Sequence, residues 1–202
     1  MSERPTKMHI LESTIAAIEA NGIQALTTRA IAAQAGVNNA ALHYYFGTKE
    51  ALVEAALALS LDNMMADTQA ILSGKESLAH RLRTLLDYMV QGTLTYPNLI
   101  RAHLWSPLIE GIGDSPFLQM QATWMDRLVR ELRSGAPSFD EAEARRALST
   151  ALGGIVFLAL MPETASRRAP SIRSRAARER YVDQLVSFVM ASRRSPMRRT
   201  RT

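Results

Sequence analysis

The side chains with the clearest potential for recognition chemistry lie in residues 27–52, TTRAIAAQAGVNNAALHYYFGTKEAL. There His43 is followed directly by Tyr44, Tyr45 and Phe46, although aromatic residues make up only 6% of the chain. Asn and His can hydrogen-bond to base edges, Ala can contact a thymine methyl, and Tyr hydroxyls can reach phosphate oxygens. The residue types therefore predict contacts with DNA.

The spacing around these side chains predicts two short helices joined by a tight turn. Thr27 or Thr28 can cap the first of them, and its apolar residues recur on one face. Gly36 can adopt the left-handed conformation that ends this helix, and Val37 can fill the angle before a helix over 38–45. This is the pattern of a helix-turn-helix, whose second helix enters the DNA major groove.

The third helix is expected to divide into a buried and an outward face. Leu42 and Phe46 are expected to face the core of the small domain. The outward face then carries small or polar side chains that permit close approach to a groove: Asn39, Ala40, Ala41 and His43. Asn38, at the start of the helix, is a further candidate for a DNA contact.

Helical spacing of apolar residues continues along nearly the whole chain, and no strand alternation is found, so we predict an all-α protein of about nine helices. Ser138 and Glu141 are expected to form a capping box at one helix start. The helices besides the two just described are expected at 8–21, 49–72, 77–95, 98–110, 115–134, 139–160 and 171–192.

Composition excludes several classes of protein. The 202 residues are 47% hydrophobic and 21% charged, as in an ordinary globular protein, and the absence of cysteine removes disulfides, thiolate ligands and cysteine nucleophiles. The longest apolar run, residues 151–161, is about half the ~20 residues that span a bilayer, and the N-terminus lacks a signal-peptide pattern. We therefore expect a cytoplasmic protein with no cofactor and no metal site.

The net charge of +5 is unevenly distributed. Residues 1–50 carry equal numbers of basic and acidic side chains, residues 51–166 are acidic, and the basic excess lies in residues 167–202. The final residues are expected to form a solvated flexible tail that can add salt-dependent affinity for phosphates.

The same segment resembles the DNA-binding domain of the TetR family of bacterial transcription regulators. The matching stretches are LTTRAIAAQAGV, residues 26–37, and ALHYYFGTKEAL, residues 41–52. The resemblance implies DNA contacts by Thr28 and Arg29 at the start of the second helix, base contacts by the third helix, and phosphate contacts by Tyr44, Tyr45 and Lys49. His43 departs from the pattern, since Tyr is commonest at its position.

The resemblance also implies three regions: a helix-turn-helix domain in 1–50, a helical effector-binding and dimerisation domain in 51–192, and a basic tail in 193–202. A two-fold dimer would hold two recognition helices at a fixed separation on a palindromic operator. We expect the last two long helices to form that interface, with an intrachain core of the same residues as the alternative: Leu148, Leu152, Ile155, Val156, Tyr181, Leu185, Phe188 and Val189.

A small-molecule pocket is the other property that the resemblance implies. Apolar walls with a few polar groups are typical of such pockets, although the same side chains more often form ordinary core. The candidate lining residues, which favour a mainly lipophilic effector, are Tyr88, Met89, Gln91, His103, Trp105, Phe117, Met120, Trp124 and Phe157.

Three classes of function compete. A dimeric repressor released from its operator by a small ligand is the preferred interpretation. The alternative is a DNA-binding interaction protein, an activator or nucleoid factor controlled by a protein partner. An enzyme is disfavoured because the sequence has no phosphate-binding glycine loop, nucleophile elbow or catalytic Ser/His/Asp context.

Overall fold

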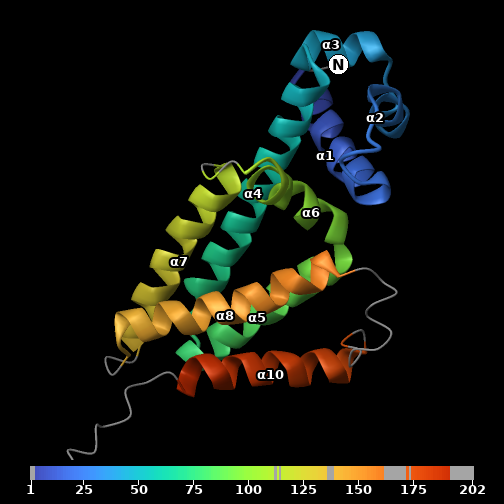
Figure 1. Ribbon diagram of the computed structural model, residues 1–202. Helices are drawn as coiled ribbons and strands as arrows, with labels where there is room; N and C mark the ends of the chain where they lie inside the picture. The colour runs from blue at the N-terminus through green and yellow to red at the C-terminus, as the bar shows by residue number, and fades with distance from the viewer. Residues whose placement is uncertain are drawn as a thin grey trace, which may run out of the picture. The chain divides into compact units, whose positions relative to one another are not determined.

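The computed structural model describes residues 3–111, 113, 115–135, 139–161, 172 and 174–191 (Figure 1). Within these residues every regular element is a helix, so the all-α prediction is confirmed. The elements are α1 (Glu3–Asn21), α2 (Thr28–Ala35), α3 (Asn39–Phe46), α4 (Lys49–Leu72), α5 (Leu78–Thr95), α6 (Pro97–Trp105), η1 (Ser106–Glu110), α7 (Pro116–Gly135), α8 (Glu141–Leu160) and α10 (Arg175–Ala191).

The turn between α2 and α3 is defined by its caps. Thr27 is the N-cap of α2, and its side chain accepts a hydrogen bond from the Ala30 amide. Gly36 ends α2 with φ +63°, a left-handed conformation that glycine adopts without steric cost. Asn38 is the N-cap of α3, so the third helix begins one residue later than predicted.

Contacts between Cα atoms divide the chain into two compact units: Met1–Asp67 with Tyr96–Met120, and Thr68–Thr95 with Gln121–Thr202. The first unit contains the helix-turn-helix together with α6, because α6 packs on α1. Helices α4 and α7 each contribute residues to both units. The functional boundary at residue 50 stays a prediction.

A single apolar cluster holds the first unit together. Leu42 of α3 belongs to this cluster and is 3% exposed, as the sequence predicts. Val37 and Phe46 are partly buried and pack against the cluster. Burial of this kind stabilises by roughly 1.5–3 kcal/mol for each fully buried large aliphatic side chain. The buried members are Ile10, Ala17, Ile18, Leu26, Ile31, Ala32, Ala35, Leu42, Leu52, Val53 and Ala102.

The predicted helix over 98–110 is two elements in the structure. α6 ends at Trp105 and a π-helix, η1, continues from Ser106 to Glu110. Pro107 lies at the start of η1 and has no amide hydrogen, so it cannot donate the hydrogen bond of a regular α-helix. The Gly111 amide closes η1 by donating to the Ser106 carbonyl.

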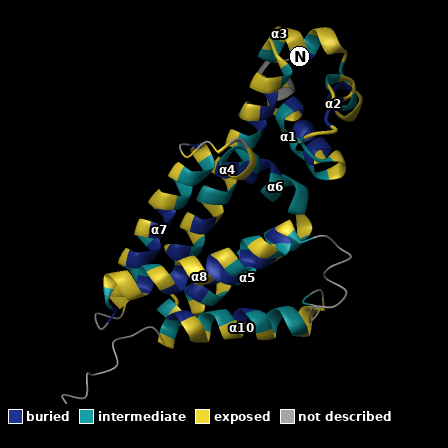
Figure 2. Cartoon of the chain, viewed as in Figure 1, coloured by how far each residue is buried: buried dark blue, intermediate teal, exposed yellow. Residues whose placement is uncertain are grey.

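In the second unit, α5, α8 and α10 pack against one another. α8 and α10 approach closely at Gly154, since a Cβ at its position would lie 3.2 Å from the hydroxyl oxygen of Tyr181 on α10. Buried residues of the chain are coloured dark blue on the ribbon of Figure 2. Those of the three helices include Leu82, Leu85, Leu86, Leu148, Ile155, Val182 and Val189. Among the described residues, no helix is both long and apolar enough to span a membrane.

The predicted capping box at the start of α8 is wrong. The N-cap is Asp140, whose carboxylate accepts hydrogen bonds from the amides of Ala142 at 3.0 Å and Glu143 at 3.3 Å. Glu141 is therefore the first helical residue, and Ser138 lies outside the described residues. Asp140 is a favourable N-cap because its carboxylate accepts from two otherwise free amides and interacts favourably with the positive end of the helix dipole.

Replacing this cap should measurably weaken the protein. We expect Asp140→Ala to lower the free energy of unfolding by roughly 1–2 kcal/mol, because two amides lose their acceptor. Urea denaturation followed by circular dichroism measures the change. Ser149→Ala, on an exposed position within α8, is the control and should change stability by less than about 0.5 kcal/mol. Equal effects of the two substitutions would argue against the cap.

Candidate DNA-binding interface

α3 presents a polar outward face within the first unit. Asn39, Ala40, His43 and Tyr44 are all exposed, whereas Leu42 points into the core. Figure 2 shows the exposed residues along α2 and α3. Ala41 is half-buried and therefore contributes less to this face than predicted. A short helix with small and amide side chains outward can enter a major groove.

Asn38 has a structural role that the prediction of a DNA contact did not anticipate. Its side-chain oxygen Oδ1 accepts a hydrogen bond of 2.9 Å from the Ala41 amide. That oxygen is consequently engaged in starting α3 and is not free for a base. The signal was present in the sequence, because Asn is among the most favoured N-cap residues.

His43 is held by the turn that follows α3. Its ring nitrogen Nδ1 lies 2.7 Å from the Gly47 carbonyl oxygen, and the Gly47 amide donates to the His43 carbonyl over 2.9 Å. Gly47 has φ +73° and ψ −64°, a region that other residues rarely adopt. The imidazole is exposed but fixed in orientation.

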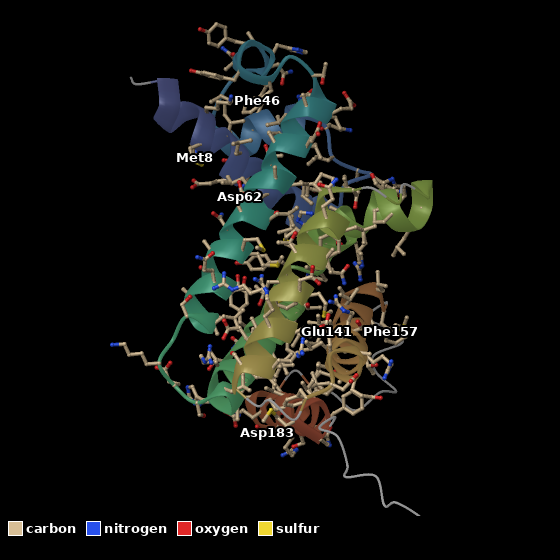
Figure 3. All side chains as sticks on the ribbon, turned by 90° about the vertical axis from the view of Figure 1, so that its left-hand side faces the viewer. Met8, Phe46, Asp62, Glu141, Phe157 and Asp183 are labelled. Carbon is tan, nitrogen blue, oxygen red and sulfur yellow. The ribbon has the colours of Figure 1, made fainter. Side chains whose placement is uncertain are left out.

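The three aromatic residues after His43 have different environments. Tyr44 is 74% exposed, so its hydroxyl is available for a phosphate, as predicted. Tyr45 is half-buried and packs against the apolar cluster, with its ring centroid 5.0 Å from that of Tyr44, and its contact with a phosphate stays a prediction. Phe46, labelled in Figure 3, packs on the same cluster and accepts a cation–π contact from Lys7, whose Nζ is 5.4 Å from the ring.

The remaining predicted DNA contacts lie at helix starts. Arg29 is exposed in the first turn of α2, whereas Thr28 and Lys49 are half-buried at the first residues of α2 and α4. Amides at helix N-termini favour anions such as phosphate. Arg29 is thus the most accessible of these three side chains.

A polar contact that the sequence analysis missed joins α1 to α6. The Glu19 carboxylate accepts from the Leu99 amide at 3.0 Å, and the Asn98 side chain donates to the Glu19 carbonyl at 2.7 Å. Burial raises the pKa of the Glu19 carboxyl group, and hydrogen bonds from the backbone amides of Leu99 and Asn98, together with the charge of Arg101, partly oppose that rise. The sequence predicted only a helix beginning at 98 and not its contact with α1, since the two contacting residues are 80 positions apart in the chain.

The predicted ligand residues are divided between the two units. Those in the first unit are His103, Trp105, Phe117 and Met120, and those in the second are Tyr88, Met89, Gln91, Trp124 and Phe157. Phe157 is 55% exposed on α8, so it does not line an enclosed cavity within this chain. Gln91 is exposed and its amide donates to Asp87 on the same helix.

His103 lies in a compact polar and aromatic contact inside the first unit. Its Nε2 is 2.8 Å from the Ser60 hydroxyl, and its ring stacks on Phe117 with centroids 5.6 Å apart. Because Ser60 donates its one hydroxyl hydrogen to the Leu57 carbonyl, it accepts from His103. Burial lowers the pKa of His103 to about 4. His103 is therefore a buried histidine with a hydrogen-bond partner inside its own unit, which favours the ordinary core that the sequence analysis gave as the alternative to a ligand site.

Because His103 is buried, we expect acidification to lower the free energy of unfolding. Between about pH 4 and the ordinary pKa of 6.5, the unfolded chain binds a proton at this position that the folded chain does not, so stability rises with pH. We expect a loss of about 3 kcal/mol on going from neutral pH to pH 4. Denaturant titrations across this range measure it, with His103→Gln as the matched variant. If the free energy of unfolding of His103→Gln depends on pH as strongly as that of the wild type, His103 is not the group responsible.

Trp124 is the predicted ligand residue with an unsatisfied polar atom. The side chain is 5% exposed, and its indole Nε1 has no hydrogen-bond partner among the described residues. A buried donor without an acceptor costs roughly 1–3 kcal/mol. An acceptor atom from a bound molecule would remove that cost.

The predicted dimer residues also fall into two groups. Leu148, Leu152, Ile155 and Val189 are at most 5% exposed within this single chain, and thus belong to its own core. Accessible residues remain along the same helices: Val156, Tyr181 and Leu185 are half-buried, and Phe157, Leu160 and Phe188 are exposed. Burial inside the chain explains the discrepancy, because apolar spacing alone cannot separate core from interface.

The fold and the α3 face define the class: a helical protein with an N-terminal helix-turn-helix. Comparison with known proteins makes the class more specific. Residues 10–56 match the family described as bacterial regulatory proteins, tetR family. A comparison with curated protein sequences finds no match.

Solved structures of regulators share the whole fold. A TetR transcription regulator from Haloarcula marismortui aligns with TM-score 0.73 and 22% identity, covering 95% of this chain and 100% of the other. A tetR-family regulator from Streptomyces coelicolor aligns with TM-score 0.70 and 17% identity, covering 95% and 82%. The regulator FadR from Bacillus subtilis, in complex with stearoyl-CoA, aligns with TM-score 0.64 and 15% identity, covering 93% and 99%.

Residues 10–56 are thus similar to the N-terminal domain of the tetR family, and the chain shares its fold with solved TetR-family regulators. The matched family is one of regulatory proteins, which agrees with the expectation that the chain is not an enzyme.

Proposed function

We propose that this protein is a dimeric transcriptional repressor that binds a palindromic operator and is released by a small, mainly lipophilic ligand. The observation that carries the proposal is the outward face of α3, where Asn39, Ala40 and His43 are exposed on a helix capped at both ends. Such a face fits the major groove and places a bidentate amide, a methyl-sized residue and an imidazole near base edges. Action on chromosomal DNA implies a cytoplasmic location.

The accessible residues of α8 and α10 support a two-fold dimer. Phe157 and Leu160 on α8 and Phe188 on α10 are large apolar side chains that are 36–55% exposed. Exposed apolar residues on one pair of helices are typical of an interface. The paired copy would set the distance between recognition helices, so that half-sites one helical turn or a multiple apart are read together.

The second unit supports binding of a ligand with an apolar body and a hydrogen-bond acceptor. Buried Trp124 has an indole hydrogen without a partner, and it lies among buried apolar residues of α7 such as Met125 and Leu128. The stearoyl-CoA bound by the FadR neighbour has an acyl chain and carbonyl groups. That molecule is a rational first probe for this chain.

Selection from randomised duplex DNA at about physiological salt tests the DNA-binding part of the proposal, because non-specific affinity is weak there. We expect a palindrome to be enriched by the wild type and weakened or altered by Asn39→Ala. The control is Asn63→Ala, an exposed substitution of the same type on α4. A folded dimer that enriches no sequence would overturn the repressor interpretation and favour control by a protein partner.

Ligand release is tested on the selected operator. Stearoyl-CoA should lower operator affinity in the wild type and quench tryptophan fluorescence, since the chain has two tryptophans. Trp124→Phe should weaken that response while leaving operator affinity without ligand unchanged. If stearoyl-CoA has no effect on the operator complex, this choice of effector is wrong.

A further inference from the structure

The turn after α3 determines which ring nitrogen of His43 carries the hydrogen and which can accept a hydrogen bond. Its Nδ1 lies 2.7 Å from the Gly47 carbonyl oxygen, which can only accept. Nδ1 must therefore carry the hydrogen, and in the neutral ring the other nitrogen, Nε2, is left with a lone pair. The exposed imidazole thus presents an acceptor to whatever lies against α3.

The geometry of the turn maintains this tautomer. The Gly47 amide donates to the His43 carbonyl at 2.9 Å, so two hydrogen bonds join the same pair of residues. Gly47 has φ +73° and ψ −64° where its carbonyl meets the ring, a backbone conformation that glycine adopts more readily than other residues. Reversing the tautomer would break the Nδ1 hydrogen bond and place two acceptors face to face.

The major groove offers both acceptors and donors at its base edges. Guanine presents N7 and O6 acceptors and thymine presents O4, whereas the exocyclic amino groups of adenine and cytosine are donors. Nε2 with a lone pair is complementary to those amino groups and is not complementary to N7, O6 or a phosphate oxygen. A tyrosine at this position would impose no single polarity, because its hydroxyl can both donate and accept a hydrogen bond.

We propose that His43 determines operator specificity as a hydrogen-bond acceptor, taking a hydrogen bond at Nε2 from the exocyclic amino group of adenine or cytosine. This inference rests on the proposed DNA-binding function and deepens it. Asn39, one helical turn away on the same exposed face, can both donate and accept, so it does not impose one polarity.

The experiment begins with the operator selected by the wild type. His43→Phe identifies the base pair that His43 reads, because that position should become less selective. His80→Phe, an exposed histidine on α5, is the matched control and should leave every position unchanged. Thermal melting of both variants verifies that they remain folded.

Single-atom changes in the DNA then test the polarity. At the identified pair, purine in place of adenine, or pyrimidin-2-one in place of cytosine, removes the amino group, and a 7-deaza purine removes the N7 acceptor. We expect amino removal to weaken wild-type binding about three- to tenfold more than it weakens His43→Phe binding, as for one hydrogen bond. Removal of N7 should weaken the two proteins equally.

A second measurement does not depend on DNA. Long-range proton–nitrogen NMR correlation of the free protein at neutral pH should show His43 with its hydrogen on Nδ1. A hydrogen on Nε2 would overturn the inference whatever the DNA results are. If removal of N7, and not of the amino group, weakens wild-type binding more than His43→Phe binding, the inference about His43 is wrong, although the repressor proposal still holds. Absence of any selected operator would overturn the proposed function itself and with it this inference.

Discussion

Replacement of Ala40 by Glu should abolish operator binding while leaving the protein folded. Ala40 is exposed in the first turn of α3, between Asn39 and His43 in the sequence, on the face proposed to enter the groove. A carboxylate there meets the negative potential of the DNA, and apposed like charges cost several kcal/mol. We expect operator affinity to fall by roughly 100-fold, which corresponds to about 2.7 kcal/mol.

The matched control for this variant is Ala70→Glu on α4. Ala70 is also an exposed helical alanine, so the two variants have the same net charge and the same change in helix propensity. Fluorescence anisotropy with labelled operator at fixed salt measures both. Equal losses in the two variants would show that net charge alone governs binding, and would argue against α3 as the recognition helix.

Replacement of Leu148 by Ala should have the largest effect on stability. Leu148 is 0% exposed in the core formed by α5, α8 and α10. Removing a buried leucine side chain costs the lost burial and leaves a cavity, together about 2–5 kcal/mol. For a chain of this length the melting temperature should fall by roughly 4–20 °C.

Phe157→Ala on the same helix is the informative comparison. Phe157 is 55% exposed, so its truncation should cost less than about 1 kcal/mol in the unfolding of the monomer. We expect it instead to raise the dimer dissociation constant, measured by analytical ultracentrifugation. If Phe157→Ala unfolds the monomer as strongly as Leu148→Ala, the assignment of core and accessible face on α8 is wrong.

The recognition of a helix-turn-helix depended on local signals only. Thr27 and Gly36 define the ends of α2 through their own side chain and backbone preferences, and Leu42 lies in the core because apolar residues recur at helical spacing. Such preferences act over a few residues, so the sequence by itself determined the helix type, the turn and the outward face of α3.

Other properties were decided only by tertiary contacts. The choice between core and interface for Leu148 required knowing that α5 and α10 cover that side of α8. Likewise Glu19 meets Leu99 because the folded chain brings α1 to α6, and nothing in the spacing of either helix specifies that partner.

For His43, the sequence and the folded structure determined different properties. The sequence determined that a histidine stands on the recognition helix, since residue identity and helical register are local. The three-dimensional geometry of the turn decided which nitrogen is free, because the Gly47 carbonyl, four residues further along the chain, reaches Nδ1 only when the turn is folded. Helix type follows from short-range preferences, but the direction of a hydrogen bond depends on where the fold places its partner.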